Sequence, residues 1–256
     1  MKCPKCKNKV SPDELNCPYC GARIGEEIIE RLLPLLRKPL EKPATPLSVH
    51  HRLFTGMIKP NVVFSDIVSS PDLLGPLLVV FLNSFLSTIY FLLPIGKIFF
   101  TDMLFFLFFK DSLSSLPIIL FYFNLSLAFL ELFLVSFLYW LPLKLLGRDV
   151  RFKSFVSMVG YAYVLVVLGQ MVSLIITSIN SSVLVMPALP PVLQLSTTQF
   201  YLYLLWKVGK TAKLVCLLGV AFLITPGIRK AAKLSTSFSL IFSYSVVLIA
   251  YTLLTF

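Results

Sequence analysis

The sequence predicts an all-α polytopic membrane protein with a small, Cys-rich segment at its N-terminus. Two observations support this fold class. The 256 residues are 57% hydrophobic and only 14% charged, whereas soluble domains carry about 25% charged residues. So large an apolar surface requires lipid as its solvent. Four of the five cysteines lie within the first 20 residues, ahead of any long apolar run.

The formal net charge of +11 raises the question of nucleic-acid binding, but the placement of the basic residues argues against it. Beyond the first 60 residues, most Lys and Arg stand beside apolar runs, where membrane proteins carry their topology signals. A nucleic-acid site would show a basic stripe interleaved with aromatic or polar residues that read the bases. We therefore expect membrane lipid, and no nucleic acid, as a partner.

Residues 1–24 carry two Cys pairs in the pattern C-x2-C, ten residues, C-x2-C. Each pair can give two thiolates to one tetrahedral metal ion, and a hairpin between the pairs can bring them together. Two disulfides are the alternative, but an N-terminus without an export signal is expected in a reducing compartment, which favours zinc. Four protein ligands leave no open position, so we expect a structural zinc ribbon. The expected ligands are Cys3, Cys6, Cys17 and Cys20.

Residues 25–47 are expected to connect this ribbon to the membrane domain. Residues 25–33 can form two helical turns, and the four prolines that follow favour a semi-extended spacer over 34–47. Residues 48–71 mix basic and apolar side chains and are too short and too polar to span a bilayer. They predict one or two interfacial helices, broken at Pro60.

Five apolar runs follow within the expected membrane domain, residues 48–256. Each run reaches the roughly 20 residues that a helix needs to cross about 30 Å of hydrocarbon. The runs lack the alternation of a transmembrane strand, and inside lipid the backbone must be hydrogen-bonded within the crossing, so helices are predicted. The expected spans are about 73–95, 116–143, 155–179, 200–225 and 235–256.

The basic residues predict the orientation of these spans. The loops after the second and fourth spans hold seven Lys and Arg, whereas residues 180–199 carry no charge. Because basic loops stay on the cytoplasmic side, the N-terminus is predicted to be cytoplasmic and the C-terminus outside. The short apolar run between Lys97 and Lys110 fits an interfacial or re-entrant helix on the outer face. A sixth crossing is the alternative for this run.

Charged residues inside the predicted spans are costly unless they are paired or face the interior of the bundle. Glu131 lies near the middle of the second span, and Lys207, Lys210 and Lys213 share one face of the fourth because they repeat every three residues. We expect Glu131 to contact Lys213 or Lys210. Such a pair either locks the helices together or lines a polar path for an ion or a lipid headgroup.

Two short motifs lie near the starts of the first and third spans. Residues 72–76 read D-L-L-G-P, in which Asp72 can cap the first helical turn and Gly75 can let another helix approach closely. In the third span, Gly160 can likewise let another helix approach closely, and the tyrosines at 161 and 163 are expected to lie near the lipid headgroups. Tight packing explains both motifs, and a ligand site is the alternative. The motif residues are Asp72, Gly75, Pro76, Gly160 and Tyr161.

These motifs resemble the D-L-x-G-P and Gly-Tyr signatures of the Yip1 family, and the five-span order is similar as well. The resemblance covers about 48–256 and leaves the zinc ribbon outside the family domain, as in fusions that resemble prokaryotic members. It implies a membrane protein, here of a prokaryotic cell membrane, that associates with other proteins and influences membrane organisation or traffic. Residue 74 is Leu where eukaryotic members usually have Tyr, which argues against a Rab-type partner.

The sequence contains no recognisable catalytic arrangement. It has no H-E-x-x-H, no phosphate-binding Gly-rich loop, and no His within the expected spans, so no enzymatic activity is predicted. We expect a membrane adaptor or scaffold whose ribbon reaches a cytoplasmic protein, and which can form homo- or hetero-oligomers. The alternative is a transporter or channel component with a polar path at Glu131 and the lysine face of the fourth span.

Overall fold

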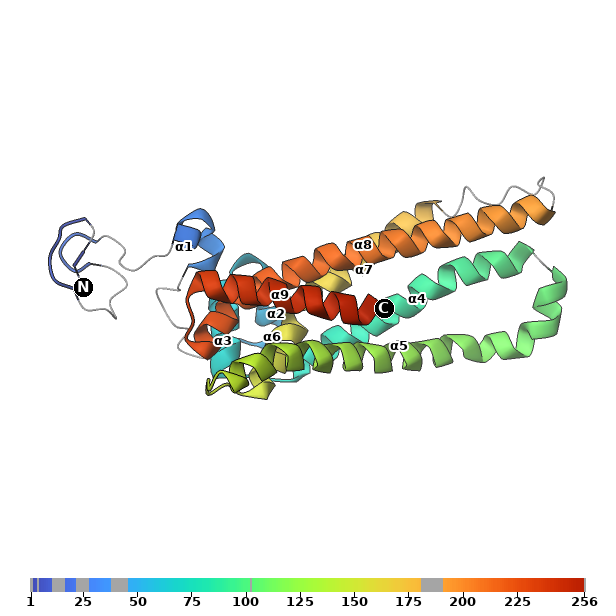
Figure 1. Ribbon diagram of the computed structural model, residues 1–256. Coiled ribbons are helices and arrows are strands. Elements are labelled where there is room, and N and C mark those ends of the chain that lie inside the picture. Colours follow the sequence, from blue (N-terminus) through green and yellow to red (C-terminus); the bar gives the residue numbers. More distant parts are fainter. Residues whose placement is uncertain are drawn as a thin grey trace.

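The computed structural model describes residues 2–3, 5–10, 17–21, 28–37, 46–101, 103–180 and 191–255. Side chains are described for these residues except 28, 31, 94–114, 177, 179–180, 191–208, 210 and 255. Within the described ranges the regular secondary structure is helical apart from one isolated bridge between Lys2 and Lys9, which confirms the all-α class. The elements are α1 Ile28–Leu32, the 3-10 turn η1 Pro34–Leu36, α2 Val49–Ile58, α3 Pro60–Ser69, α4 Leu74–Thr101, α5 Met103–Leu145, α6 Phe152–Ala162, α7 Val164–Asn180, α8 Pro191–Ala232 and α9 Thr236–Thr255 (Figure 1).

Five stretches of the described helices are long and apolar enough to cross a membrane, which confirms the predicted number of spans. Helices α6 and α7 together form the third of them. Figure 1 shows α1, α2 and α3 gathered at one end of the bundle, which we call the α3 end; α4, α5 and α8 extend furthest from it. The five stretches are Leu74–Leu93, Ser115–Leu145, Phe152–Ile176, Thr211–Ala232 and Thr236–Leu254.

The apolar run between Lys97 and Lys110 forms neither a separate interfacial helix nor a crossing of its own in the described chain. It supplies the last residues of α4 and the first residues of α5. Helix α5 then continues through two internal prolines to Leu145. The run therefore lengthens helices α4 and α5 beyond their membrane-crossing stretches, away from the α3 end, whereas we expected a separate interfacial or re-entrant helix.

The two helices expected at the membrane interface are present, and they break at Pro60 as expected. Proline suits the first position of α3, where its missing N–H leaves no hydrogen bond unmade. Helix α3 packs against α6 and α8, and its Val63, Phe64 and Ile67 are at most 1% exposed. This helix is therefore part of the bundle core at its α3 end.

The segment between ribbon and bundle is docked to the bundle. Glu30 of α1 is only 2% exposed and Leu36 of η1 is fully buried. Arg229 near the end of α8 donates hydrogen bonds to the Glu30 carboxylate (2.5 Å) and the Leu36 carbonyl (2.6 Å), and the Thr236 hydroxyl donates to Glu30 at 2.7 Å. Pro34–Leu36 thus forms a docked 3-10 turn where we expected an extended spacer; residues 38–45 of that spacer lie outside the described chain.

The third span is interrupted at Tyr163, which separates α6 from α7. The backbone there has φ −64° and ψ −8°, and the Val166 N–H donates to the Tyr163 carbonyl at 2.9 Å. This i to i+3 bond is the tighter 3-10 pattern. The interruption places Tyr163 at the level of Glu131, where its side chain takes part in the site described below.

Candidate functional site

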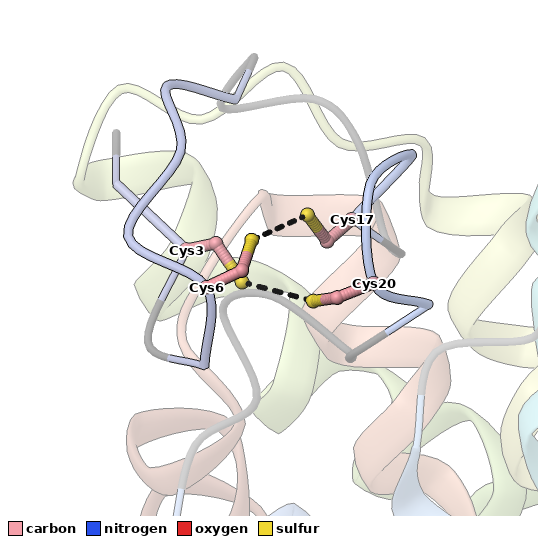
Figure 2. Close-up of side chains that lie close together, drawn as sticks. All are labelled: Cys3, Cys6, Cys17 and Cys20. Carbon is pink, nitrogen blue, oxygen red and sulfur yellow. Dashed lines mark hydrogen bonds between the residues drawn. The ribbon is translucent and has the colours of Figure 1, made fainter.

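The four N-terminal cysteines converge on one point (Figure 2). Cys3 Sγ lies 3.6 Å from Cys20 Sγ, and Cys6 Sγ lies 3.4 Å from Cys17 Sγ. All four sulfurs lie within 4.8 Å of one another. A tetrahedral zinc ion with bonds of about 2.3 Å holds its sulfurs roughly 3.8 Å apart, so these thiols fit one zinc ion. They are free thiols, not the disulfides that we considered as the alternative.

Tight turns set up the two Cys pairs. The Lys7 N–H donates to the Cys3 carbonyl and the Gly21 N–H donates to the Cys17 carbonyl, both at 2.9 Å. Gly21 has φ +67°, a left-handed conformation that glycine adopts without strain. The backbone N–H of Cys6 donates to the Cys3 sulfur and lowers the pKa of that thiol to about 6, against the opposing effect of burial. The lowered pKa favours the thiolate, the form that binds metal, at Cys3. The backbone N–H of Asn8 acts in the same direction on the Cys6 thiol, but burial and the neighbouring thiols outweigh it and raise the pKa of Cys6 instead.

At the α3 end, Arg52 of α2 joins two carboxylates. Its Nε donates to Asp66 Oδ2 of α3 at 3.0 Å, and its Nη1 donates to Asp72, which precedes α4. Arg52 is 4% exposed and Asp66 is 6% exposed. Burial by itself lowers the pKa of Arg52, but the charges of Asp66 and Asp72 outweigh it and raise that pKa. The guanidinium therefore stays charged.

The two sequence motifs meet at Asp72. Its carboxylate accepts hydrogen bonds from the Gly75 N–H at 3.1 Å and from the Tyr161 hydroxyl at 3.0 Å, so it caps α4 and links α4 to α6. A Cβ on Gly75 would lie 2.2 Å from Tyr161 Cζ, and one on Gly160 would lie 2.3 Å from Pro76 Cβ. Glycine at both positions is therefore what allows α4 and α6 to touch.

This contact predicts a measurable cost for one methyl group at Gly160. The new Cβ would also lie 2.7 Å from the Pro76 Cα, and because that atom is backbone the helices must move apart. We expect Gly160→Ala to destabilise the bundle by about 1–3 kcal/mol, the usual cost of overpacking, measured as a lower Tm in mild detergent. In the control Gly56→Ala, the Cβ meets only Val63 Cγ1 at 3.6 Å, so stability should stay the same or rise. An equal loss in both variants would contradict the close-contact argument.

The tyrosines of the Gly-Tyr region do not lie where we expected them. Tyr161 and Tyr163 are 3% and 2% exposed, and both point into the bundle rather than toward headgroups. Each hydroxyl donates to a carboxylate, Tyr161 to Asp72 and Tyr163 to Glu131. The prediction that these tyrosines lie near the headgroups was wrong. Each hydroxyl has a carboxylate within reach, and a charged acceptor forms a stronger hydrogen bond than interfacial water does.

Glu131 and Lys213 form the ion pair expected within the spans. Lys213 Nζ lies 2.9 Å from the Glu131 carboxylate, and Tyr163 donates to the same carboxylate at 3.2 Å. Glu131 is 9% exposed, so it is buried with its charge paired. Lys210 and Lys207 precede Lys213 on α8 by about one and two helical turns, and their side chains lie outside the described ones.

A cavity of about 490 Å³ adjoins this ion pair, between α4, α5, α7 and α8. Its walls combine apolar side chains such as Phe91, Leu127 and Val166 with polar groups from all four helices. The polar groups that matter for its chemistry are Asn83, Ser87, Asn124, Glu131, Gln170 and Lys213.

Sequence reasoning missed Arg52, Asp66, Glu30 and Arg229. All four lie in or beside basic and polar segments that are typical of solvated membrane flanks, and nothing in their spacing specifies a partner. Their pairing depends on the docking of α1, α2 and α3 on the bundle, which only the tertiary structure reveals.

A five-span helical bundle with a four-Cys ribbon defines an integral membrane protein with a small metal-binding domain. A family model described as the Yip1 domain matches residues 55–256, and one described as a zinc-ribbon domain matches residues 1–24. The chain therefore belongs to the Yip1 family and carries a zinc ribbon at its N-terminus. No curated protein and no solved structure matches the chain.

Proposed function

We propose that the protein is a non-enzymatic membrane adaptor whose zinc ribbon binds a cytoplasmic protein. The observation that carries the proposal is the closed four-Cys site. All four sulfurs are within reach of one ion, so the site has no open position for a substrate and offers a rigid surface instead of chemistry. The Yip1 domain supplies the membrane-bound body to which that surface is fixed.

The described surface of the ribbon supports a partner that carries negative charge. Lys2, Lys5, Lys7 and Lys9 are exposed, and Tyr19 is 69% exposed. Exposed aromatic side chains supply much of the binding energy at protein interfaces, while complementary charge speeds and orients the encounter. An acidic protein surface therefore fits this ribbon.

A cytoplasmic position of the ribbon is part of the same proposal. The turns between α5 and α6 and between α8 and α9 lie at the α3 end, together with α1 (Figure 1). These turns and the helix ends beside them carry Lys144, Arg148, Arg151, Lys153, Arg229, Lys230 and Lys233. The positive-inside rule assigns an end with this many basic residues to the cytoplasm.

A transport pathway, the alternative function, has less support. The cavity reaches toward the α3 end only as far as Glu131 and Cys216, and beyond them the described bundle is filled by buried apolar side chains. Tyr139, Leu217 and Ile224 are at most 1% exposed. A continuous polar path would have to cross this packed layer.

Deletion of the ribbon tests the adaptor proposal. We expect a chain lacking residues 1–24 to insert in the membrane and keep the Tm of its bundle, because the docked segment from Ile28 to Arg37 is retained. It should lose the proteins that co-purify with the full chain after cross-linking in cells. Lys5→Glu/Lys7→Glu, which reverses exposed charge without touching a cysteine, should lose the same proteins. Unchanged co-purification in both chains would contradict the proposal.

A further inference from the structure

The turn between α5 and α6 begins with a well-defined helix end. The Gly147 N–H donates to the Lys144 carbonyl at 3.0 Å. The Arg148 N–H donates to the Leu143 carbonyl at 3.1 Å, and Gly147 has φ +72°. This pair of hydrogen bonds around a left-handed glycine is the Schellman motif. The end of α5 therefore holds one conformation.

A tryptophan fixes the other half of the turn from its inner side. The indole N–H of Trp140 donates to the Val150 carbonyl at 3.1 Å. The Trp140 ring also packs edge-on against the ring of Phe152, with the ring centres 5.7 Å apart. Tryptophan is typical of the level at which a bilayer changes from hydrocarbon to headgroups. The turn is thus held against α5 at this level.

The outer side of the turn carries two exposed leucines among charged side chains. Leu145 is 78% exposed and Leu146 is 64% exposed. Within the described part of the chain, none of the four cations of the turn forms an ion pair. Four cations and one carboxylate leave the turn with a net charge of +3. The exposed charged residues are Lys144, Arg148, Asp149, Arg151 and Lys153.

The lipid-covered surface of the bundle continues into this turn. Phe133 and Phe137 are exposed on the outer side of α5, within the membrane-crossing stretch Ser115–Leu145. Lys144 follows Phe137 by seven residues, which is about two helical turns along the same side. The last residue of the crossing stretch is the exposed Leu145 itself. The leucines and cations therefore lie where the acyl chains end and the phosphates begin.

Membrane topology by itself does not explain this arrangement. The positive-inside rule requires basic residues on the flank of a span, but it does not require exposed leucines between them. In water, these two side chains would keep apolar surface hydrated, which is unfavourable. Apolar side chains beside Lys and Arg are typical of segments that lie on an anionic membrane surface.

We propose that the α5–α6 turn binds anionic phospholipids of the membrane that the protein spans. Leu145 and Leu146 contact the upper part of the acyl chains, and Arg148 and Arg151 donate to phosphate oxygens, for which the guanidinium group has the fitting geometry. A zwitterionic headgroup adds its own ammonium next to these cations, so the turn distinguishes the two kinds of lipid. This surface is independent of the ribbon and of the adaptor proposal.

The fluorescence of Trp140 tests the proposal at the turn itself. The chain has two tryptophans, and Trp206→Phe leaves Trp140 as the single reporter. The full chain with this change is reconstituted in vesicles of equal amounts of dioleoylphosphatidylglycerol and dioleoylphosphatidylcholine. One lipid carries brominated acyl chains, which quench tryptophan at close range, and a second preparation carries them on the other lipid.

We expect stronger quenching when the phosphatidylglycerol is brominated. A basic residue near an anionic lipid strengthens the attraction about fivefold, so the quenching should correspond to a preference of at least about fivefold for the anionic lipid. The preference should weaken at high salt, which screens exposed charges. Equal quenching in the two preparations would overturn the proposal.

Two variants that remove the same charge locate the surface. Arg148→Gln/Arg151→Gln changes two exposed side chains, so the chain should fold normally while the preference falls below about twofold. Lys59→Gln/Lys233→Gln removes two exposed cations elsewhere at the α3 end and should keep the full preference. Loss of preference in both variants, or in neither, would contradict the assignment to the α5–α6 turn.

Inorganic phosphate separates a lipid from a soluble anion. Replacement of chloride by phosphate at constant ionic strength should leave the preference unchanged, because the free anion has no acyl chains for Leu145 and Leu146 to contact. Disappearance of the preference in phosphate would assign the cations to a soluble phosphate group and overturn the lipid assignment.

Discussion

Replacement of Cys17 by Ser is expected to abolish zinc binding and unfold the ribbon while the bundle stays folded. The described hydrophobic core of the ribbon consists of Val10 and the cysteines themselves, so little besides the metal can hold it together. Structural zinc contributes roughly 10–16 kcal/mol to domains of this kind. Zinc content by elemental analysis should fall from one per chain to none, and trypsin should cleave at the ribbon lysines far faster.

Cys216→Ser is the matched control for this prediction. Cys216 lies on α8 against Gly169, within the bundle, and it should leave zinc content and ribbon protection unchanged. A strong chelator should reproduce the Cys17→Ser result on the natural chain without lowering the Tm of the bundle. Stoichiometric zinc in Cys17→Ser would show that the four sulfurs do not form the metal site.

Loss of Arg52 is expected to give the largest destabilisation of the membrane domain. Arg52→Met leaves the buried Asp66 carboxylate without its cationic partner and removes the link to Asp72. Breaking a buried pair from one side typically costs 3–5 kcal/mol. We expect a correspondingly lower Tm in detergent, together with faster proteolysis at the α3 end.

A second substitution separates the charge from the packing of Arg52. In the double variant Arg52→Met/Asp66→Asn, the uncompensated charge is gone and part of the stability should return. Arg148→Met, at an exposed arginine of the α5–α6 turn, should change stability by less than about 0.5 kcal/mol. Equal losses in Arg52→Met and Arg148→Met would show that the junction at Asp72 contributes nothing.

The features that the sequence predicted are those that depend on local chemistry. Span length, absence of charge and Cys spacing are readable along the chain, so the five-span bundle and the ribbon were predicted and confirmed. The Glu131–Lys213 contact was also predictable, because an unpaired charge at that depth is too costly to persist. In such cases the lipid environment or the metal ion leaves the chain very few stable conformations.

The features that the sequence did not predict depend on which surfaces meet. The aromatic-belt rule is a statistical one, and it failed for Tyr161 because the carboxylate of Asp72, just before α4, accepts the hydrogen bond of its hydroxyl. The interruption at Tyr163 occurs without proline, the usual signal of a helix break. Nothing in the sequence around Glu30 indicates that its carboxylate accepts a hydrogen bond from Arg229, almost 200 residues away.

The docking of Glu30 under Arg229 sets how far the ribbon can travel. If α1 is held on the bundle, the linker between the ribbon and the bundle is the seven peptide units from Gly21 to Ile28. At full extension this linker spans about 25 Å. Without the contact between Glu30 and Arg229, the linker would extend from Gly21 to residue 46 and span a distance several times longer. A short linker keeps the ribbon close to the lipid surface. This raises the effective concentration of the ribbon for any target that is itself confined to that surface.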